Sequence, residues 1–228
     1  MHLGSKQSGG AAPAFGAEEE AFARLIDLAL EISVDGLLIA GDLFDSARVG
    51  EAVVEWTASQ LNRLDCETVV LPGNHDALLP GSPYEVHDFA ARCNATTVIS
   101  DHGGELVSLL DGRVVVWGRP VVDHAPWFRP LHGVPPRPRD CFAVVVAHGL
   151  FVDDAEEETV RGSPIYGSEL ERLDWDYVAL GHWPRYREIR ETPPVIYAGE
   201  LAGGPRHHGS AVVVSCANGR VSSRRRCF

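Results

Sequence analysis

The sequence predicts an α/β fold in a single domain of 228 residues. Up to His75, helical patterns alternate with short apolar runs, as in parallel strands joined by helices. From Glu105 onward, apolar runs separated by glycine-containing turns indicate antiparallel pairing. Hydrophobic residues make up 45% of the chain and charged residues 23%, a composition typical of an ordinary globular protein. We find no internal repeat and no domain boundary.

The first part of the chain contains two predicted helices and two predicted strands. Glu18 to Glu20 give the first helix an acidic start, which suits the positive end of the helix dipole. Apolar side chains such as Phe22, Leu25 and Ile26 then recur at helical spacing. In order, helix and strand are predicted to alternate at residues 17–34, 37–40, 49–64 and 68–71.

The second part is predicted to be richer in strands. Asp111-Gly112 separates two β-rich runs, which is a hairpin signal. Further strands are predicted at residues 142–146 and 177–180, and short strands at 195–221 around the turn at Asn218-Gly219. The proline-rich segment 132–140 and the acidic segment 153–158 are predicted surface loops.

Charge and cysteine content restrict the class of protein. A formal net charge of −12 lacks the overall basic character of most nucleic-acid binders, although a local basic strip remains compatible with it. The five cysteines are scattered without a CxxC pair, so neither a disulfide framework nor a thiolate zinc site is expected. Neither a signal peptide nor an apolar run long enough to span a membrane is apparent, and we expect a cytoplasmic protein with no membrane contact.

Four apolar runs end in residues that can bind a metal. Taken singly, a Gly-Asp after a strand is commonly a turn or a helix cap, and a strand-end histidine is commonly hydrogen-bonded in the core. The carboxyl ends of strands converge in open α/β sheets, however, so side chains at four such ends are predicted to share one pocket. These strand-end residues are Asp42, Asn74 with His75, His148 and His182.

The motifs that carry these residues resemble those of the calcineurin-like metallophosphoesterases. They are GDLFD (41–45), GNHD (73–76), AHG around His148 and GHWP (181–184), with MHLG (1–4) similar to the tail of the family's first motif, Asp-x-His. Within this superfamily, the residues of these motifs are most similar to those of the SbcD-type DNA-repair exonucleases. The resemblance implies a four-layer α-β-β-α sandwich of two mixed β-sheets flanked by helices.

The resemblance also implies a site for two divalent metal ions. Such ions polarise phosphoryl oxygens and lower the pKa of a bound water. A nitrogen and oxygen donor set without thiolate suits manganese, our expectation, with iron or zinc as alternatives. By the family's scheme, Asp42 bridges both ions, and the second ion is held by Asp42, Asn74, His148 and His182.

Two further roles follow from the resemblance. His75 is expected to protonate the leaving alkoxide as a general acid, and Asp45 to orient the His75 ring. The alternative for Asp45 is a cap of the following helix. Only His2 and Asp42 remain as ligands of the first metal, which is therefore expected to bind weakly.

The sequence departs from the family's motifs at both ends. The motif's aspartate would lie directly before Met1, and we expect the upstream reading frame to encode it together with the missing first strand of the domain. Pro184 stands where the family has its last histidine, and proline offers no side-chain ligand. His207 or His208 is a candidate replacement, with a solvated pair of loop histidines as the alternative.

The expected function is metal-dependent hydrolysis of a phosphoester substrate by a phosphodiesterase or nuclease. DNA is a candidate substrate, and an SbcC-like ATPase is a candidate partner by family analogy. A catalytically weakened member that acts as a binding or scaffold subunit is the alternative. A cyclic-nucleotide or phosphoprotein phosphatase is a third reading, which differs only in the walls of the pocket.

Overall fold

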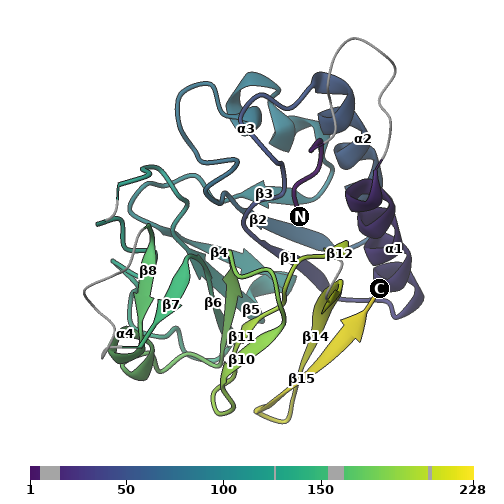
Figure 1. Ribbon diagram of the computed structural model, residues 1–228. Helices are drawn as coiled ribbons and strands as arrows, with labels where there is room; N and C mark the ends of the chain where they lie inside the picture. The colour runs from purple at the N-terminus through teal and green to yellow at the C-terminus, as the bar shows by residue number, and fades with distance from the viewer. Residues whose placement is uncertain (6–15, 126, 154–161, 205–206) are drawn as a thin grey trace.

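The computed structural model describes residues 1–5, 16–125, 127–153, 162–204 and 207–228. Two sheets form the centre of the molecule, and short helices lie around them (Figure 1). No helix among these described residues is both long and apolar enough to cross a membrane. The helices are α1 (Ala17–Glu31), α2 (Glu51–Leu61), α3 (Pro83–Val86) and α4 (Gly167–Glu171), with 3₁₀ turns η1 (Phe89–Arg92) and η2 (Leu110–Gly112).

The first half of the chain forms a three-stranded sheet of order β1-β2-β3. The strands are β1 (Gly36–Ala40), β2 (Glu67–Leu71) and β3 (Thr96–Val98), and both pairings are parallel. This arrangement confirms the predicted alternation of helix and strand. Helix α1 ends at Glu31, three residues before the predicted end, because Ser33 takes a left-handed backbone conformation with φ 51°.

The second sheet has six strands in the order β10-β11-β9-β6-β5-β4. The hairpin predicted at Asp111-Gly112 is present as the antiparallel pair β4–β5. The next predicted strands differ from the expectation of antiparallel pairing, because β5–β6, β6–β9 and β9–β11 are parallel. Of the two sheets, only this one is mixed. Its strands are β4 (Glu105–Leu109), β5 (Val114–Gly118), β6 (Phe142–His148), β9 (Tyr177–Gly181), β10 (Arg187–Arg190) and β11 (Val195–Tyr197).

Alternating side chains show how the two sheets pack. Val69 and Leu71 of β2 share a buried cluster with Val144 of β6, so these side chains fill the space between the sheets. Val70 points the other way and packs with α1 and α2, whereas Val145 packs with α4 on the far side of the second sheet. The four predicted layers are therefore present, and α4 is the only helix described in the last one.

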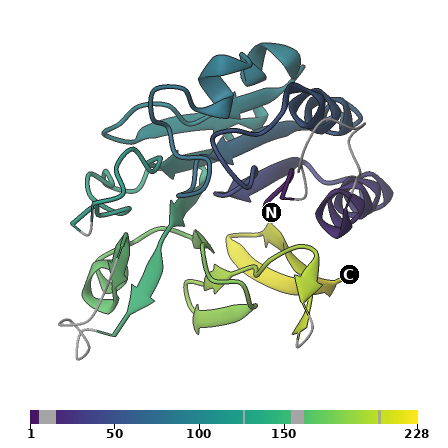
Figure 2. The ribbon, with the colours of Figure 1, turned by 45° about the horizontal axis from the view of Figure 1, so that its top comes forward.

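Three two-stranded ribbons complete the described part of the structure. The chain reverses at Asn218-Gly219, as predicted, and both residues have positive φ, 52° and 71°. Figure 2 shows the last hairpin, in yellow, below the amino end of the chain. Segment 132–140 contains no strand, in agreement with a loop, and most of 153–158 lies outside the described residues. The ribbons pair β7 (Leu150–Val152) with β8 (Pro164–Tyr166), β12 (Gly203–Gly204) with β13 (His207–His208), and β14 (Ser210–Ala217) with β15 (Arg220–Cys227).

Candidate metal centre

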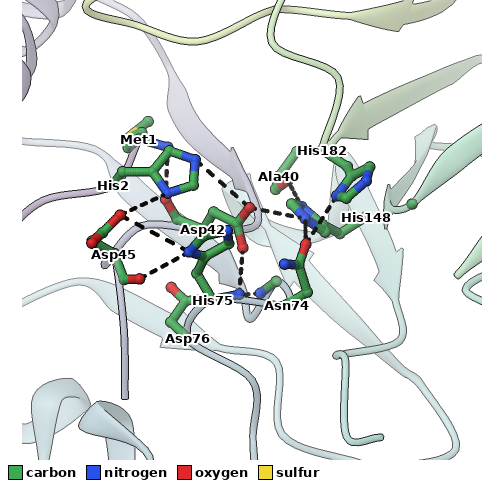
Figure 3. Close-up of polar contacts among 12 residues, drawn as sticks. Met1, His2, Ala40, Asp42, Asp45, Asn74, His75, Asp76, His148 and His182 are labelled. Carbon is green, nitrogen blue, oxygen red and sulfur yellow. Dashed lines mark hydrogen bonds and ion pairs between the residues drawn. The ribbon is translucent and has the colours of Figure 1, made fainter. Parts of the chain in front are cut away.

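The predicted strand-end residues meet where the carboxyl ends of the two sheets adjoin (Figure 3). Asp42 follows β1 and Asn74 follows β2, so the three-stranded sheet contributes two oxygen donors. His148 is the last residue of β6 and His182 follows β9, so the six-stranded sheet contributes two imidazoles. Parallel neighbours in each sheet place these ends side by side.

Asp42 lies between two groups of possible ligands. His2, Asp42 and His75 form one group and Asp42, His148 and His182 the other, and within each group the ligand atoms lie within 4.8 Å of one another. Oδ2 of Asp42 is 3.1 Å from Nε2 of His148 and 3.9 Å from Nε2 of His2. Its Oδ1 accepts the backbone N–H of His75 at 2.9 Å. One carboxylate is thus shared by both groups, as a bridging ligand requires.

The second group converges on the side-chain oxygen of Asn74. Oδ1 of Asn74 is 2.9 Å from Nε2 of His148 and 2.9 Å from Nδ1 of His182. The other ring nitrogen of His148, Nδ1, lies 2.9 Å from the carbonyl oxygen of Ala40. A carbonyl only accepts hydrogen bonds, so Nδ1 carries a hydrogen and Nε2 is the nitrogen available to a metal.

Two glycines make this close approach possible. A Cβ on Gly41 would lie 2.0 Å from Nδ1 of His148, and Gly41 also has a φ of 90°. A Cβ on Gly73 would lie 2.3 Å from Oδ1 of Asp42. The glycine that precedes each motif's polar residue is therefore required by packing at the centre itself.

The buried pair of Asp42 and His148 is electrostatically coupled. Burial alone opposes ionisation of Asp42, but the charge and hydrogen bond of His148 and the amide of His75 hold the pKa of its carboxyl well below its usual range. Burial likewise opposes protonation of His148, but Asp42 and the Ala40 carbonyl raise the pKa of its imidazole above the usual value. The pocket thus favours positive charge next to Asp42.

His2, Asp45 and His75 form the outer side of the centre. Nδ1 of His2 is 3.3 Å from Oδ1 of Asp45, and burial together with the Met1 amino group lowers the pKa of His2 to about 4. Nδ1 of His75 is 2.9 Å from the backbone oxygen of Asp45 and 3.9 Å from its Oδ1. Asp45 therefore contacts both histidines. It does not cap a helix, because α2 starts at Glu51 after an N-cap at Gly50.

One structural residue of the site is not apparent from the sequence pattern. Asp76 is fully buried, and its carboxylate accepts the N–H of Gly73 at 2.7 Å and the N–H of Phe44 at 3.1 Å. The hydroxyl of Tyr84 donates to the same carboxylate at 2.5 Å. Asp76 therefore ties the loop that carries Asp42 to the loop after β2. Its place in GNHD was the only signal, because Phe44, the partner through which Asp76 joins the two loops, lies 32 residues away in sequence.

Near Pro184, the structure departs from the alternative of a solvated histidine pair at His207 but not at His208. The carbonyl oxygen of Pro184 accepts the N–H of Glu200 at 3.0 Å. Nε2 of His207 lies 2.6 Å from Oε1 of Glu200, and both side chains are partly buried. His208 is exposed. His207 is thus held by a carboxylate, and neither histidine belongs to the two ligand groups among the described residues.

The residues at the centre fit a divalent metal ion. Oδ2 of Asp42 lies 3.1 Å from Nε2 of His148, and Oδ1 of Asn74 lies 2.9 Å from ring nitrogens of both His148 and His182. Such a set is stabilised only by a proton or a cation among its members. Mixed carboxylate, amide oxygen and imidazole donors without thiolate suit first-row ions.

Comparisons with known proteins support the same family. Residues 16–186 match the family model described as calcineurin-like phosphoesterase. No curated protein matches the chain. The crystal structure of TT1561 of Thermus thermophilus is similar, with a TM-score of 0.57, 13% identity, and coverage of 91% of this chain and 93% of that one. A second solved structure has a TM-score of 0.58 and 15% identity over 94% of this chain and 96% of its own. These two likenesses concern the fold alone.

Proposed function

Because this chain belongs to the calcineurin-like phosphoesterase family, we propose that it hydrolyses phosphodiester bonds with manganese at the centre around Asp42. The observation that carries the proposal is the position of Asp42 in both ligand groups, which suits the bridge between two cations. When bound, divalent cations supply Lewis-acid activation of the phosphoryl group and a nucleophile from water near neutral pH. We propose that DNA is one substrate and that an SbcC-like ATPase is a partner.

The side chains at the centre would have different roles in holding the cations and in moving a proton. Asn74, His148 and His182 would hold one cation together with Asp42, and His2 would hold the other with Asp42. Nδ1 of His75 is committed to the Asp45 carbonyl, so the Nε2 nitrogen of this ring is the one that can pass a proton to the leaving oxygen. Oδ1 of Asp45 lies 3.9 Å from Nδ1 of His75, so Asp45 would help to orient the ring.

The test compares small substrates before DNA. Manganese-dependent turnover of bis(p-nitrophenyl) phosphate should exceed that of p-nitrophenyl phosphate, and single- and double-stranded DNA should then be compared. His182→Ala removes a ligand, whereas His102→Ala changes an exposed histidine outside both groups and serves as the matched control. Equal diester turnover by the His182→Ala variant and the wild type would contradict the proposal.

A scaffold role is the second candidate, and the backbone at Pro184 favours it. Proline supplies no ligand there, and its carbonyl is already bonded to Glu200. A chain that binds manganese, turns over no phosphoester and retains a stable partner in pull-downs would establish this alternative. Turnover by the purified chain alone would dismiss it.

A further inference from the structure

The charge of the chain is divided unevenly along its length. Residues 182–228 contain eight arginines and three glutamates, whereas the preceding residues contain 12 basic and 29 acidic ones. The β14–β15 hairpin, residues 210–227, holds four arginines and no acidic residue. A strongly acidic protein therefore carries one basic element, and such asymmetry is typical of proteins that bind polyanions.

The arginines of β15 are largely without acidic partners. None of the four forms an ion pair among the residues that the structure describes. Arg220 and Arg224 are exposed and lie on one face of the ribbon, four positions apart in the strand. Arg225 lies on the other face, over the Tyr186 ring at 5.0 Å from its centroid. Arg226 is less available, since it lines a hollow with Asp27 and Glu31 of α1.

The free edge of β15 lies between these two faces. The hairpin is a two-stranded sheet, so the outer backbone edge of β15 is unpaired among the described strands. Figure 1 shows β15 on the outside of the hairpin, away from the six-stranded sheet. Eight residues of strand extend over about 26 Å, and arginines on both sides of this edge flank one continuous track.

The base of the hairpin adjoins the loop that carries His182. A Cβ on Gly199 would lie 2.8 Å from the N of Tyr186 and 3.1 Å from Oγ of Ser210, so this glycine packs between that loop and the first residue of β14. Trp183, next to His182, is 36% exposed. Tyr186, three residues further along the same loop, packs partly against the core between the sheets and lies under Arg225, so this loop joins His182 to the hairpin.

We propose that the β14–β15 hairpin, with Trp183 and Tyr186, binds a single strand of nucleic acid and leads it to the metal centre. The inference rests on the proposed phosphodiester chemistry at that centre. Arginines and edge N–H groups would contact phosphates, and the exposed Trp183 ring would stack on a base, the usual combination for single strands. A partner that offers only negative charge, such as an anionic membrane, would leave this ring unused.

The test measures binding without hydrolysis. Fluorescence anisotropy with a labelled oligothymidylate of about twelve nucleotides in EDTA compares the wild type with Arg220→Ser/Arg224→Ser. Arg113→Ser/Arg139→Ser is the matched control, since it removes the same charge at the amino ends of β5 and β6, opposite the metal centre. In a plot of the logarithm of the binding constant against the logarithm of the salt concentration, each phosphate contact with a single strand contributes about 0.7 to the steepness of the slope. Loss of two contacts should therefore make the slope shallower by about 1.4 and weaken binding about 25-fold near 0.1 M salt.

Several results would overturn the inference. Unchanged affinity of the hairpin variant, equal loss in the control, or tighter binding to duplex DNA or to vesicles with anionic lipid would each contradict it. Should the double variant fold poorly by circular dichroism, Arg220→Glu near the exposed turn repeats the comparison. Turnover of bis(p-nitrophenyl) phosphate separates the two proposals, because the hairpin variant should keep this activity. If no variant and no wild-type protein turned the substrate over, the proposed function would be refuted. The anisotropy measurement would still decide whether the hairpin binds single strands.

Discussion

Replacing Asp76 should disturb both folding and metal binding. Its buried carboxylate accepts three hydrogen bonds, from Gly73, Phe44 and Tyr84. Asp76→Ala leaves all three donors unpaired in the interior, and each such donor costs about 1–3 kcal/mol, so we expect a loss of at least about 3 kcal/mol in the free energy of unfolding. Manganese affinity should fall as well, because Asp76 joins the two loops that carry Asp42 and Asn74.

Tyr84→Phe separates the two effects. The variant removes one hydrogen bond to a charged group, worth about 1.5–3 kcal/mol, and leaves the ring packing with Phe44 and Phe89 intact. Two backbone donors still hold the carboxylate, so stability should fall by about 2 kcal/mol, or about 4–8 °C in Tm, with little change in manganese affinity. Urea unfolding of the metal-free protein and calorimetric titration with manganese measure the two quantities. Wild-type stability and affinity in Asp76→Ala would refute the reasoning.

Four other changes test the centre directly. His75→Ala should lower diester turnover about 10²-fold or more at unchanged metal content, since general acid catalysis is commonly worth that much; loss of metal would instead show a ligand. Asp42→Asn should weaken both metals together in elemental analysis, and two retained ions would disprove the bridge. Gly41→Ala should abolish tight manganese binding, because its Cβ would occupy the place of the His148 ring, and normal titration would contradict this packing argument. Pro184→His should raise occupancy of the first metal, and unchanged stoichiometry would mean that the loop follows another path. The metal-free protein should lose stability as pH rises through the pKa of His148, which is raised above its ordinary 6.5, and again as pH falls through the depressed pKa of Asp42. If Asp42→Asn lost stability in the same way at both ends of a pH series of denaturation curves, that result would be inconsistent with the proposed coupling of Asp42 and His148.

The meeting of the candidate ligands at one centre could be predicted from sequence because all of them occupy the same kind of position. Each follows a short apolar run, and parallel strands bring such positions together whatever lies between them. Asn74 and His182 are 108 residues apart in sequence, yet Oδ1 of Asn74 lies 2.9 Å from Nδ1 of His182. The family resemblance then assigned roles, which the proposed variants test.

Other features could not be predicted because they depend on partners that periodicity does not encode. An apolar run indicates a strand but not its neighbour, so the parallel pairing of β6 with β5 and β9 was missed. The ion pair of Glu200 with His207 depends on the pairing of β12 with β13, and Asp76 resembles an ordinary turn residue in sequence. In each case the contact that matters can be identified only once the three-dimensional structure is known.

The origin of the candidate ligands in two separate sheets has a mechanical consequence. Asp42 and Asn74 extend from one sheet, His148 and His182 from the other, and the Ala40 carbonyl already joins β1 to β6 through the His148 ring. A bound ion would act as a cross-link between the two halves of the sandwich, and its binding energy would oppose their separation. Chelation should therefore accelerate global unfolding and raise amide exchange at the facing strand ends. Conversely, core substitutions between the sheets should alter metal affinity from a distance.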